Sequence, residues 1–151
     1  GLKNGGRLRK MTRKNFYKID EFEAIASHLR FIPAKKILAR PTFEVREAFT
    51  IEDKVNNQFS FPQYFSSDGG TISWWARPMF PSAGRFLGAY LCHDTECDRA
   101  TRSGLYKYRE DADKLFYYHL RQCGAAKWRA KIMSFAVKRY GEMLKAKGEL
   151  K

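Results

Sequence analysis

His93 and Asp94 stand side by side in AYLCHDTECD, residues 89–98, an otherwise largely apolar stretch. These two residue types suit acid–base chemistry, because an imidazole whose one nitrogen is held by a carboxylate keeps the other nitrogen free as a general base. On a helix, His93 shares a face with Tyr90 and Cys97, at spacings of three and four residues. We therefore expect the His93 ring to point into the core.

The acid expected to hold this ring is Asp113. On the next helical segment Asp113 lies on the stripe of Phe116 and Leu120, and a carboxylate on an apolar stripe needs a partner, because an unpaired buried charge is costly. Two successive helices joined by a loop of about ten residues can pack antiparallel and bring the two stripes together. The sequence thus predicts a His93–Asp113 hydrogen bond, and such a dyad could activate a water molecule or a hydroxyl nucleophile.

A metal ion could also bind next to this stretch. Asp94 projects about 100° around the helix from His93, where it could meet a cation held by a neighbouring loop. That loop could be residues 67–70, because its glycines permit a tight turn and its oxygens could ligate a hard cation. The candidate ligands are Asp94, Asp68, Gly69 and Gly70. Apart from such a cation, no cofactor is expected.

Each of these features also has a plainer structural explanation. A histidine on an apolar face is more often a hydrogen-bonded structural residue than a catalyst, and most Asp-Gly pairs are simple turns. Cys92, His93 and Cys97 could suggest zinc, but no second CxxC or HxxxH pair completes four ligands. The odd number of cysteines, three, favours a reducing compartment over a secreted disulfide framework.

The second half of the chain carries the helices that must position these side chains. Helical patterns cover residues of about 83–98, 109–123 and 126–146, and Gly104 and Gly124 separate them. On the last of these helices, one side carries aromatic and aliphatic residues that we expect to hold the helix to the domain, while cations cover the rest. The residues on that side are Trp128, Ile132, Phe135 and Arg139.

The first half of the chain shows a different pattern. Asp20 is a candidate N-cap for an amphipathic helix that ends at Pro33, with apolar residues at helical spacing. Between residues 37 and 65 apolar residues recur at even spacings, which predicts two or three antiparallel strands. Residues 66–84 predict an ordered loop pinned by two adjacent tryptophans. The fold class expected is α+β, a small antiparallel sheet followed by a three-helix C-terminal half, in a single globular domain over residues 15–151.

The net charge of +13, from 29 Lys and Arg against 16 Asp and Glu, predicts a surface that attracts polyanions. Residues 1–14 hold six cations and no acid, and we interpret them as a flexible basic arm that folds only on a partner, although a solvated tail fits as well. Nucleic acid, anionic lipid or an acidic protein could supply the counter-charge. The candidate polyanion-binding residues are Lys3, Arg7, Arg9, Lys10, Arg13, Lys14, Lys127, Arg129 and Lys131.

No apolar run approaches the roughly 20 residues that a membrane-spanning helix needs. The first residues also lack the apolar block of a secretory signal. We therefore expect a soluble protein without a transmembrane segment.

Four motifs in order, over residues of about 58–141, resemble a phage and prophage family known as domain of unknown function 1353. The motifs read YFSSDGGTISWWARPMFP, AYLCHD, REDADKLF and KWRAKIMSFAVKRYG. Ser67, Ser73 and Cys97 stand where the family usually has Thr, Pro and Tyr. The residues that match the family pattern are Asp68, His93, Asp94, Arg109 and Asp113.

A weaker likeness, of arrangement only, is to calcium-dependent phospholipases of the secreted and parvoviral kind. Those enzymes are similar in carrying His-Asp on one helix, a glycine-rich calcium loop before it and an Asp on the following helix. The likeness implies that His93 is the base, Asp94 and residues 68–70 are calcium ligands, and Asp113 orients the histidine. The secreted disulfides and the parvoviral glycine-proline loop are absent from this sequence.

Two classes of function follow from these patterns. The first is a virion-associated structural or assembly protein of a phage, assembled in the host cytoplasm, that docks on other phage structural proteins and meets DNA or an acidic protein surface through its basic arm and last helix. The alternative is a small His-Asp hydrolase that acts on lipid or another ester as the phage enters or lyses its host. Whether the chain is an enzyme stays open at this stage.

Overall fold

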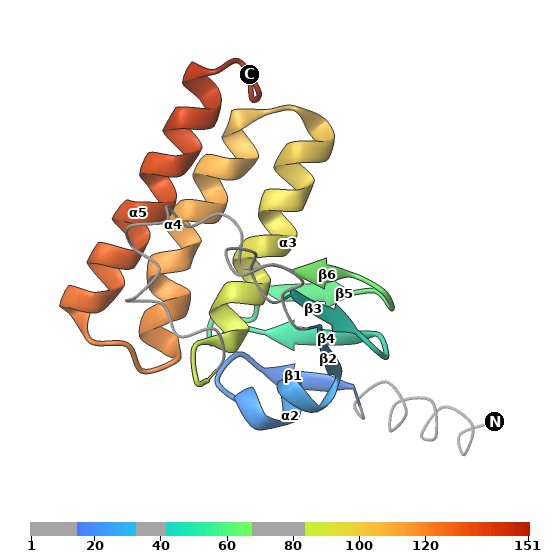
Figure 1. The fold of residues 1–151 in the computed structure, drawn as a ribbon. Coiled ribbons are helices and arrows are strands. Elements are labelled where there is room, and N and C mark those ends of the chain that lie inside the picture. The colour runs from blue at the N-terminus through green and yellow to red at the C-terminus, as the bar shows by residue number, and fades with distance from the viewer. Residues whose placement is uncertain (1–14, 33–41, 68–83) are drawn as a thin grey trace.

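The computed structural model describes residues 15–32, 42–67 and 84–151, and in them the strands and the long helices are segregated (Figure 1). The first part holds β1 (Phe16–Lys18), α2 (Phe22–Ser27), β2 (Leu29–Ile32), β3 (Thr42–Val45), β4 (Phe49–Glu52), β5 (Gln58–Phe61) and β6 (Ser66–Ser67). The second part holds α3 (Leu87–Ser103), α4 (Tyr106–Gln122) and α5 (Lys127–Ala146). The α+β class predicted from the sequence is confirmed. The predicted arm and most of the predicted tryptophan loop lie outside the described residues.

The strands form two small sheets rather than one. In the first, ordered β1-β4-β5, β4 and β5 are antiparallel, and β1 runs parallel to β4. The second, ordered β2-β3-β6, is antiparallel throughout. Phe49 and Ile51 of β4 and Phe59 and Phe61 of β5 point to the same buried side, as their period of two requires. Three strands, β3, β4 and β5, lie within residues 37–65, as predicted, whereas β1, β2 and β6 lie outside that range and were not predicted. The pairing of β1 with β4 is parallel, not antiparallel as expected.

The helix predicted to run from Asp20 to Pro33 is wrong in its second half. Helix α2 has Glu21 as its N-cap and ends at Ser27, and residues 29–32 form strand β2 instead. In β2, Leu29 lies opposite Val45, and the backbone N–H of Arg46 donates to the His28 carbonyl at 2.8 Å. Pairing with a distant strand thus decides the conformation here, because helical spacing is only a weak local preference.

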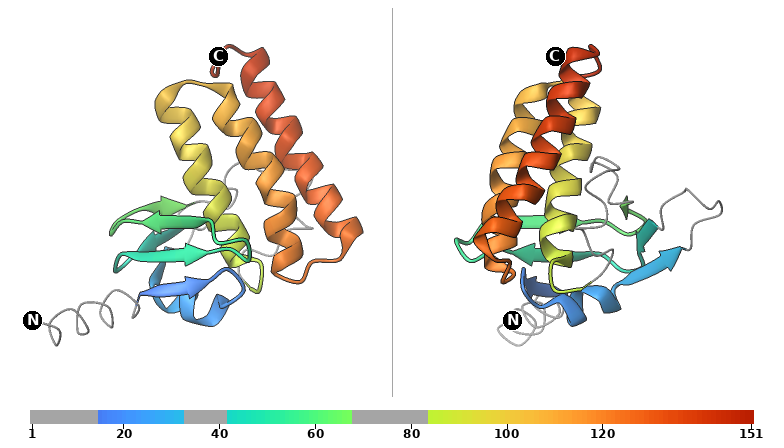
Figure 2. Two further views of the ribbon diagram at one scale, coloured as in Figure 1. Left: turned by 180° about the vertical axis from the view of Figure 1, so that it is seen from behind. Right: turned by 60° about the vertical axis from the view of Figure 1, so that its left-hand side comes forward.

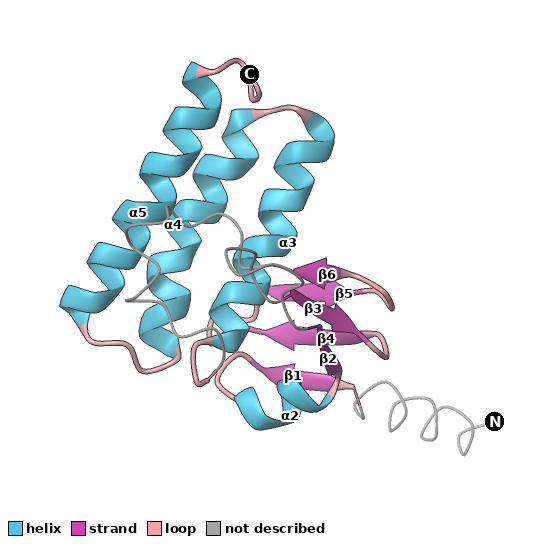
Figure 3. Ribbon diagram, viewed as in Figure 1, coloured by secondary structure: helices cyan, strands magenta, loops and turns pink. Residues whose placement is uncertain are grey.

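The three long helices stand side by side, with α4 between α3 and α5, and α3 reaches down to contact α2 and β5 (Figures 2 and 3). Helix α3 continues to Ser103, so its connection to α4 is Gly104 and Leu105 rather than the longer loop expected. Gly104 ends α3 in the left-handed conformation, with φ of 71°, which glycine adopts without steric cost. The tight connection keeps α3 and α4 antiparallel neighbours.

One cluster of buried apolar residues joins the β4-β5 hairpin to the three helices, and among its members are Ile51, Phe61, Leu91, Phe116 and Leu120. Burying a side chain of this kind stabilises a fold by about 2 kcal/mol. Gly88 lets α3 approach the turn after β1 closely, because a Cβ atom there would lie 2.1 Å from the Ile19 carbonyl oxygen. The position of α3, and of His93 within it, therefore depends on this contact.

Candidate functional site

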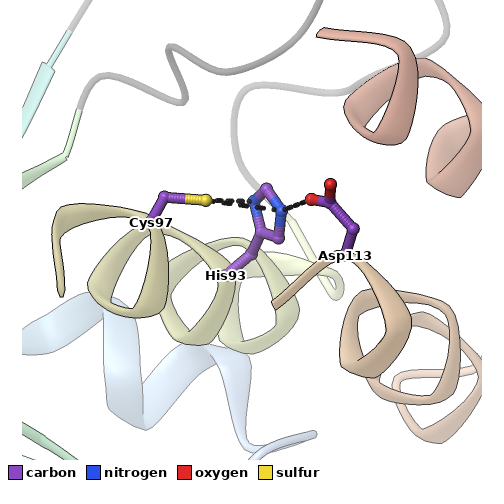
Figure 4. A group of neighbouring side chains, drawn as sticks. All are labelled: His93, Cys97 and Asp113. Carbon is purple, nitrogen blue, oxygen red and sulfur yellow. Dashed lines mark hydrogen bonds and ion pairs between the residues drawn. The ribbon is translucent and has the colours of Figure 1, made fainter. Parts of the chain in front are cut away.

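The predicted hydrogen bond between α3 and α4 is confirmed. His93 Nε2 lies 2.7 Å from Asp113 Oδ1, and both side chains are buried (Figure 4). The His93 ring also packs on Phe116, with ring centroids 4.6 Å apart. The stripes on the two helices meet as the spacing predicted, since neither the length of the connecting loop nor its conformation changes which face each side chain occupies.

Arg109 completes this buried group. Its Nε–H donates to the same Asp113 oxygen at 3.0 Å, and its Nη2–H donates to the Val137 carbonyl at 2.8 Å. Arg109 is only 2% exposed, so its charge is removed from water and depends on Asp113 for compensation. Sequence reasoning placed Arg109 in the family pattern but assigned it no role. In the structure it ties α5 to the His93–Asp113 pair.

Cys97 lies next to the His93 ring without forming a Cys–His–Asp nucleophile. Its Sγ atom is 3.7 Å from Nδ1 and 3.6 Å from Nε2. A sulfur in line with the Nδ1–H bond would be much farther from Nε2, because the two nitrogens lie on different sides of the ring. The near-equal distances therefore place Cys97 beside the ring, out of line with either nitrogen (Figure 4).

A metal ion fits this group poorly. Ligand atoms of His93, Cys97 and Asp113 all lie within 4.8 Å of one another. However, His93 Nε2 and Asp113 Oδ1 are bonded to each other at 2.7 Å, and the same oxygen accepts from Arg109, so a metal ion would have to displace these hydrogen bonds. A structural zinc ion also needs a fourth ligand, which this group of described residues does not supply. The chemistry of the donor set thus favours an internal ion pair.

The protonation of His93 follows from its neighbours. Burial alone would lower the pKa of the ring, but the interaction with the Cys97 sulfur and the hydrogen bond to Asp113 outweigh it and raise the pKa to about 9. At neutral pH the ring is therefore an imidazolium that donates to Asp113. An imidazolium cannot accept a proton, so this state opposes a general-base role.

The predicted calcium ligands are only partly within the described residues. Asp94 lies on α3 and is partly buried. Asp68, Gly69 and Gly70 lie outside the described residues, so the calcium site stays a prediction. Of the predicted polyanion-binding residues, the six in residues 1–14 also lie outside. Lys127 and Lys131 are exposed on α5, and the Arg129 guanidinium lies over the Trp128 ring at 5.5 Å.

A second buried histidine–carboxylate pair was missed by sequence reasoning. His119 Nε2–H donates to Asp53 Oδ2 at 3.0 Å, and this contact joins α4 to the β4-β5 turn. Asp53 also accepts hydrogen bonds from the backbone N–H groups of Val55 and Asn57. The spacing of His119 from Phe116, three residues on the same buried face, was a signal that could have located it.

Opposing forces set the pKa values of this second pair. Burial lowers the pKa of His119, and its hydrogen bond to Asp53 only partly offsets that effect, so the imidazole is neutral. Burial would raise the pKa of Asp53, but hydrogen bonds from His119 and Asn57 outweigh it and lower the pKa. A neutral ring donating to a carboxylate is consistent with both directions. Because both side chains are buried, the pair holds α4 to the β4-β5 turn out of contact with solvent.

The prediction that the aromatic side of α5 holds the helix to the domain is wrong. Trp128 is 57% exposed, Phe135 55% and Ile132 37%. The buried face of α5 consists mainly of small residues and carries Ala130, Met133, Ala136, Val137 and Gly141. Small side chains allow α5 to lie close to α4, whereas the aromatic rings would hold the helices apart. The solvent-facing Trp128, Ile132 and Phe135 are called the α5 stripe below.

A groove of about 550 Å³ lies between α4 and α5, next to this stripe. Residues of both helices line this groove. From α4 they are Tyr106, Glu110, Asp113, Lys114 and Tyr117, and from α5 they are Lys131, Ser134, Phe135 and Lys138. Asp113 therefore reaches the groove wall, whereas His93 is not among the lining residues. This feature, called the α4–α5 groove below, was not predicted from the sequence.

The fold and the site together define an α+β domain whose three C-terminal helices bury a His–Asp–Arg group. The chain belongs to the family described as "Protein of unknown function (DUF1353)", whose sequence profile matches residues 43–137. The match includes His93, Asp94, Arg109 and Asp113, and it begins earlier than the resemblance at about residue 58 suggested. The family predicted from the sequence motifs is confirmed.

A relative is known in a bacterium. The chain is 32% identical over 104 residues to "Uncharacterized protein y4jT" of Sinorhizobium fredii (strain NBRC 101917 / NGR234). The match covers 68% of this chain but only 30% of the relative. The domain is thus part of a longer chain in that bacterium. No solved structure matches the chain significantly.

The length and hydropathy of the helices bear on membrane insertion. Within residues 15–32, 42–67 and 84–151, none of the helices combines the length and the apolar character that crossing a bilayer requires.

Proposed function

We propose that the protein is a docking module of a phage or prophage particle, which attaches to other structural proteins through the α5 stripe. The observation that carries this proposal is the exposure of Trp128, Ile132 and Phe135 along one side of a single helix. Isolated exposed apolar residues are ordinary, but a contiguous set that includes tryptophan is typical of protein interfaces.

The charges beside the stripe indicate what kind of surface binds there. Lys127, Lys131 and Lys138 follow α5 at helical spacing, directly beside the stripe, and all three are exposed. A partner with acidic residues around an apolar centre would complement them. The basic arm, residues 1–14, would add further cations for the same partner or for nearby DNA. Assembly in the host cytoplasm and residence in the virion belong to the same proposal.

A hydrolase is the second candidate, and the 2.7 Å contact between His93 and Asp113 is the observation that favours it. Its residues would be His93 as base, Asp113 as orienter and, with calcium, Asp94 and residues 68–70 as ligands. The geometry supports it less well, because only 3% of the His93 side chain is exposed and the protonated ring has no lone pair to offer. Docking needs neither an open active site nor a neutral imidazole.

Particle composition tests the docking proposal. Particles are assembled with the wild-type chain or with the double variant Trp128→Ser, Ile132→Ser, then purified, fractionated and analysed by mass spectrometry for this chain. We expect the double variant to be reduced in particles by at least about tenfold, because a central aromatic residue typically contributes most to an interface. Tyr118→Ser is the matched control, since Tyr118 is 61% exposed on α4.

The stability of the variants and the behaviour of the control complete this test. All variants should melt cooperatively at temperatures close to the wild type, because the substituted side chains are exposed. Normal incorporation of the double variant, or equal loss for Tyr118→Ser, would contradict docking through the α5 stripe.

A further inference from the structure

The α4–α5 groove has the shape of a binding site for one or two large side chains. Its volume of about 550 Å³ lies within the range of protein sites for small organic molecules. One wall carries Tyr106, Asp113 and Tyr117, which recur along one face of α4, and the other carries Ser134 and Phe135 of α5. The groove borders the α5 stripe through Phe135, which belongs to both. A partner lying on the stripe would therefore pass over the groove.

The walls of the groove favour an aromatic guest. Phe135 is more than half exposed although it lines the groove, and Tyr117 is partly buried beside it on the α4 wall. An aromatic side chain placed between the walls would remove the apolar surface of Phe135 from water. Phe135 is thus the wall residue with the most apolar area to gain from a guest.

The size of the groove favours the largest aromatic side chain. Asp113 Oδ2 and Ser134 Oγ belong to lining residues but are inaccessible to solvent, so a guest would not bond to them. A tryptophan indole has a larger apolar ring system than phenylalanine, and the volume of about 550 Å³ accommodates it. It would therefore remove more of the Phe135 surface from water than phenylalanine would.

The rim of the groove is cationic. Lys131 and Lys138 are exposed, and no acidic group among the described residues pairs with either, whereas Lys114 on the opposite rim pairs with Glu110 at 3.4 Å. Carboxylates on both sides of an aromatic anchor would reach these lysines. Duplex DNA fits less well, because its phosphates lie on the outside and its bases are stacked, which would leave the groove empty.

We infer that the α4–α5 groove binds a tryptophan side chain of an acidic partner segment, whose flanking carboxylates pair with Lys131 and Lys138. This inference rests on the proposed docking function and adds the chemistry of the partner. In it, the α5 stripe supplies contact area, and the groove supplies selectivity for an aromatic residue within an acidic sequence.

Peptide binding tests this inference on the purified full chain. The probe is a fluorescent pool of nine-residue peptides with a central Trp flanked by Asp and Glu at random. One comparison pool replaces Trp by Ala, and another replaces the acids by Lys. We expect the acidic Trp pool to bind, and both comparison pools to bind at least about tenfold more weakly, as loss of a central anchor or of paired charge predicts. No binding of the acidic Trp pool would overturn the inference.

Variants of the chain locate the binding. Phe135→Ala and Lys131→Glu should each weaken binding of the acidic Trp pool by about tenfold. Lys147→Glu is the charge-matched control, because Lys147 is exposed beyond the last turn of α5, and it should change binding by less than about twofold. Binding that is insensitive to both groove variants would overturn the inference. So would preferential binding of a DNA duplex that is weakened by Lys131→Glu but not by Phe135→Ala.

The inference and the docking proposal can fail separately. Trp128→Ser, Ile132→Ser leaves every lining residue of the groove intact, so it should keep peptide binding while it reduces incorporation into particles. Lost incorporation together with no peptide binding by the wild type would retain docking and overturn the groove assignment. Peptide binding with normal incorporation of both the stripe and the Phe135→Ala variants would retain the groove and contradict its docking role.

Discussion

Gly141 of α5 lies directly against Asp113 of α4, and a Cβ atom at residue 141 would come within 3.1 Å of Asp113 Oδ2. The same atom would lie 3.1 Å from Cγ of Arg109. Both neighbours are held by hydrogen bonds, Asp113 to His93 and Arg109 to the Val137 carbonyl, so neither can move away without losing a buried contact. The absence of a side chain at residue 141 thus lets α5 close over the buried ion pair.

The first prediction concerns this close contact. Gly141→Ala should lower the free energy of unfolding by about 1 to 3 kcal/mol, because overpacking at the ion pair outweighs the better helix propensity of alanine. Urea unfolding followed by circular dichroism measures the change. A stability equal to or above that of the wild type would show that the helices can separate at this point without cost.

The second prediction concerns the shared carboxylate. Asp113→Ala should lower the free energy of unfolding by about 3 to 5 kcal/mol, because it leaves the buried Arg109 and His93 without their acceptor. Asp111→Asn, on the exposed side of the same helix, should change stability by less than about 0.5 kcal/mol. Similar effects of the two variants in denaturant titrations would contradict the structural role of Asp113.

The third prediction is a loss of stability at alkaline pH. The folded-state pKa of His93, about 9, lies above the ordinary value of 6.5, so the folded protein holds this proton more tightly than the unfolded chain does. The resulting stabilisation is fully present below pH 6.5 and is lost as the pH rises through 9. Its size is on the order of 1 to 3 kcal/mol.

Urea unfolding between pH 6 and pH 10 tests this prediction. His93→Gln retains a side-chain N–H donor but does not titrate, so its stability should depend less on pH over this range. If the free energy of unfolding depends on pH in the same way for the wild type and the variant, folding does not raise the pKa of His93.

The fourth prediction concerns His119 and has the opposite sign. Burial lowers the pKa of His119, so the unfolded chain binds a proton below pH 6.5 that the folded protein does not. Stability should therefore fall as the pH drops from about 7 to 5. The variant His119→Gln should lose less stability over that range in the same unfolding assay. If the stability of His119→Gln falls as steeply with decreasing pH as that of the wild type, other titrating groups cause the effect.

The fifth prediction separates docking from hydrolysis. Because the His93 ring is buried and protonated, we expect the purified chain to release no fatty acid from phospholipid vesicles above the buffer rate, with or without added calcium. His93→Gln should give the same result as the wild type. Calcium-dependent release that disappears in His93→Gln would instead favour the hydrolase.

The sequence by itself determined the features that depend on local spacing. The three long helices, the inward direction of His93 and its meeting with Asp113 were all predicted, because a helical period of 3.6 residues assigns each side chain to a face whatever the rest of the chain does. The family motifs added Arg109 without its role. The α+β class followed from the change of period between the two halves of the chain.

Tertiary structure alone decided the features that depend on distant partners. Residues 29–32 have helical spacing yet form β2, because β3 supplies backbone hydrogen bonds that no local pattern reveals. Either side of α5 could have faced inward, and the small residues around Gly141 occupy the interface because only they fit against Arg109 and Asp113. The α5 stripe is exposed, and the α4–α5 groove lies beside it, because the small residues of α5 face α4. Sequence spacing states which residues share a face, but close packing decides which face is buried.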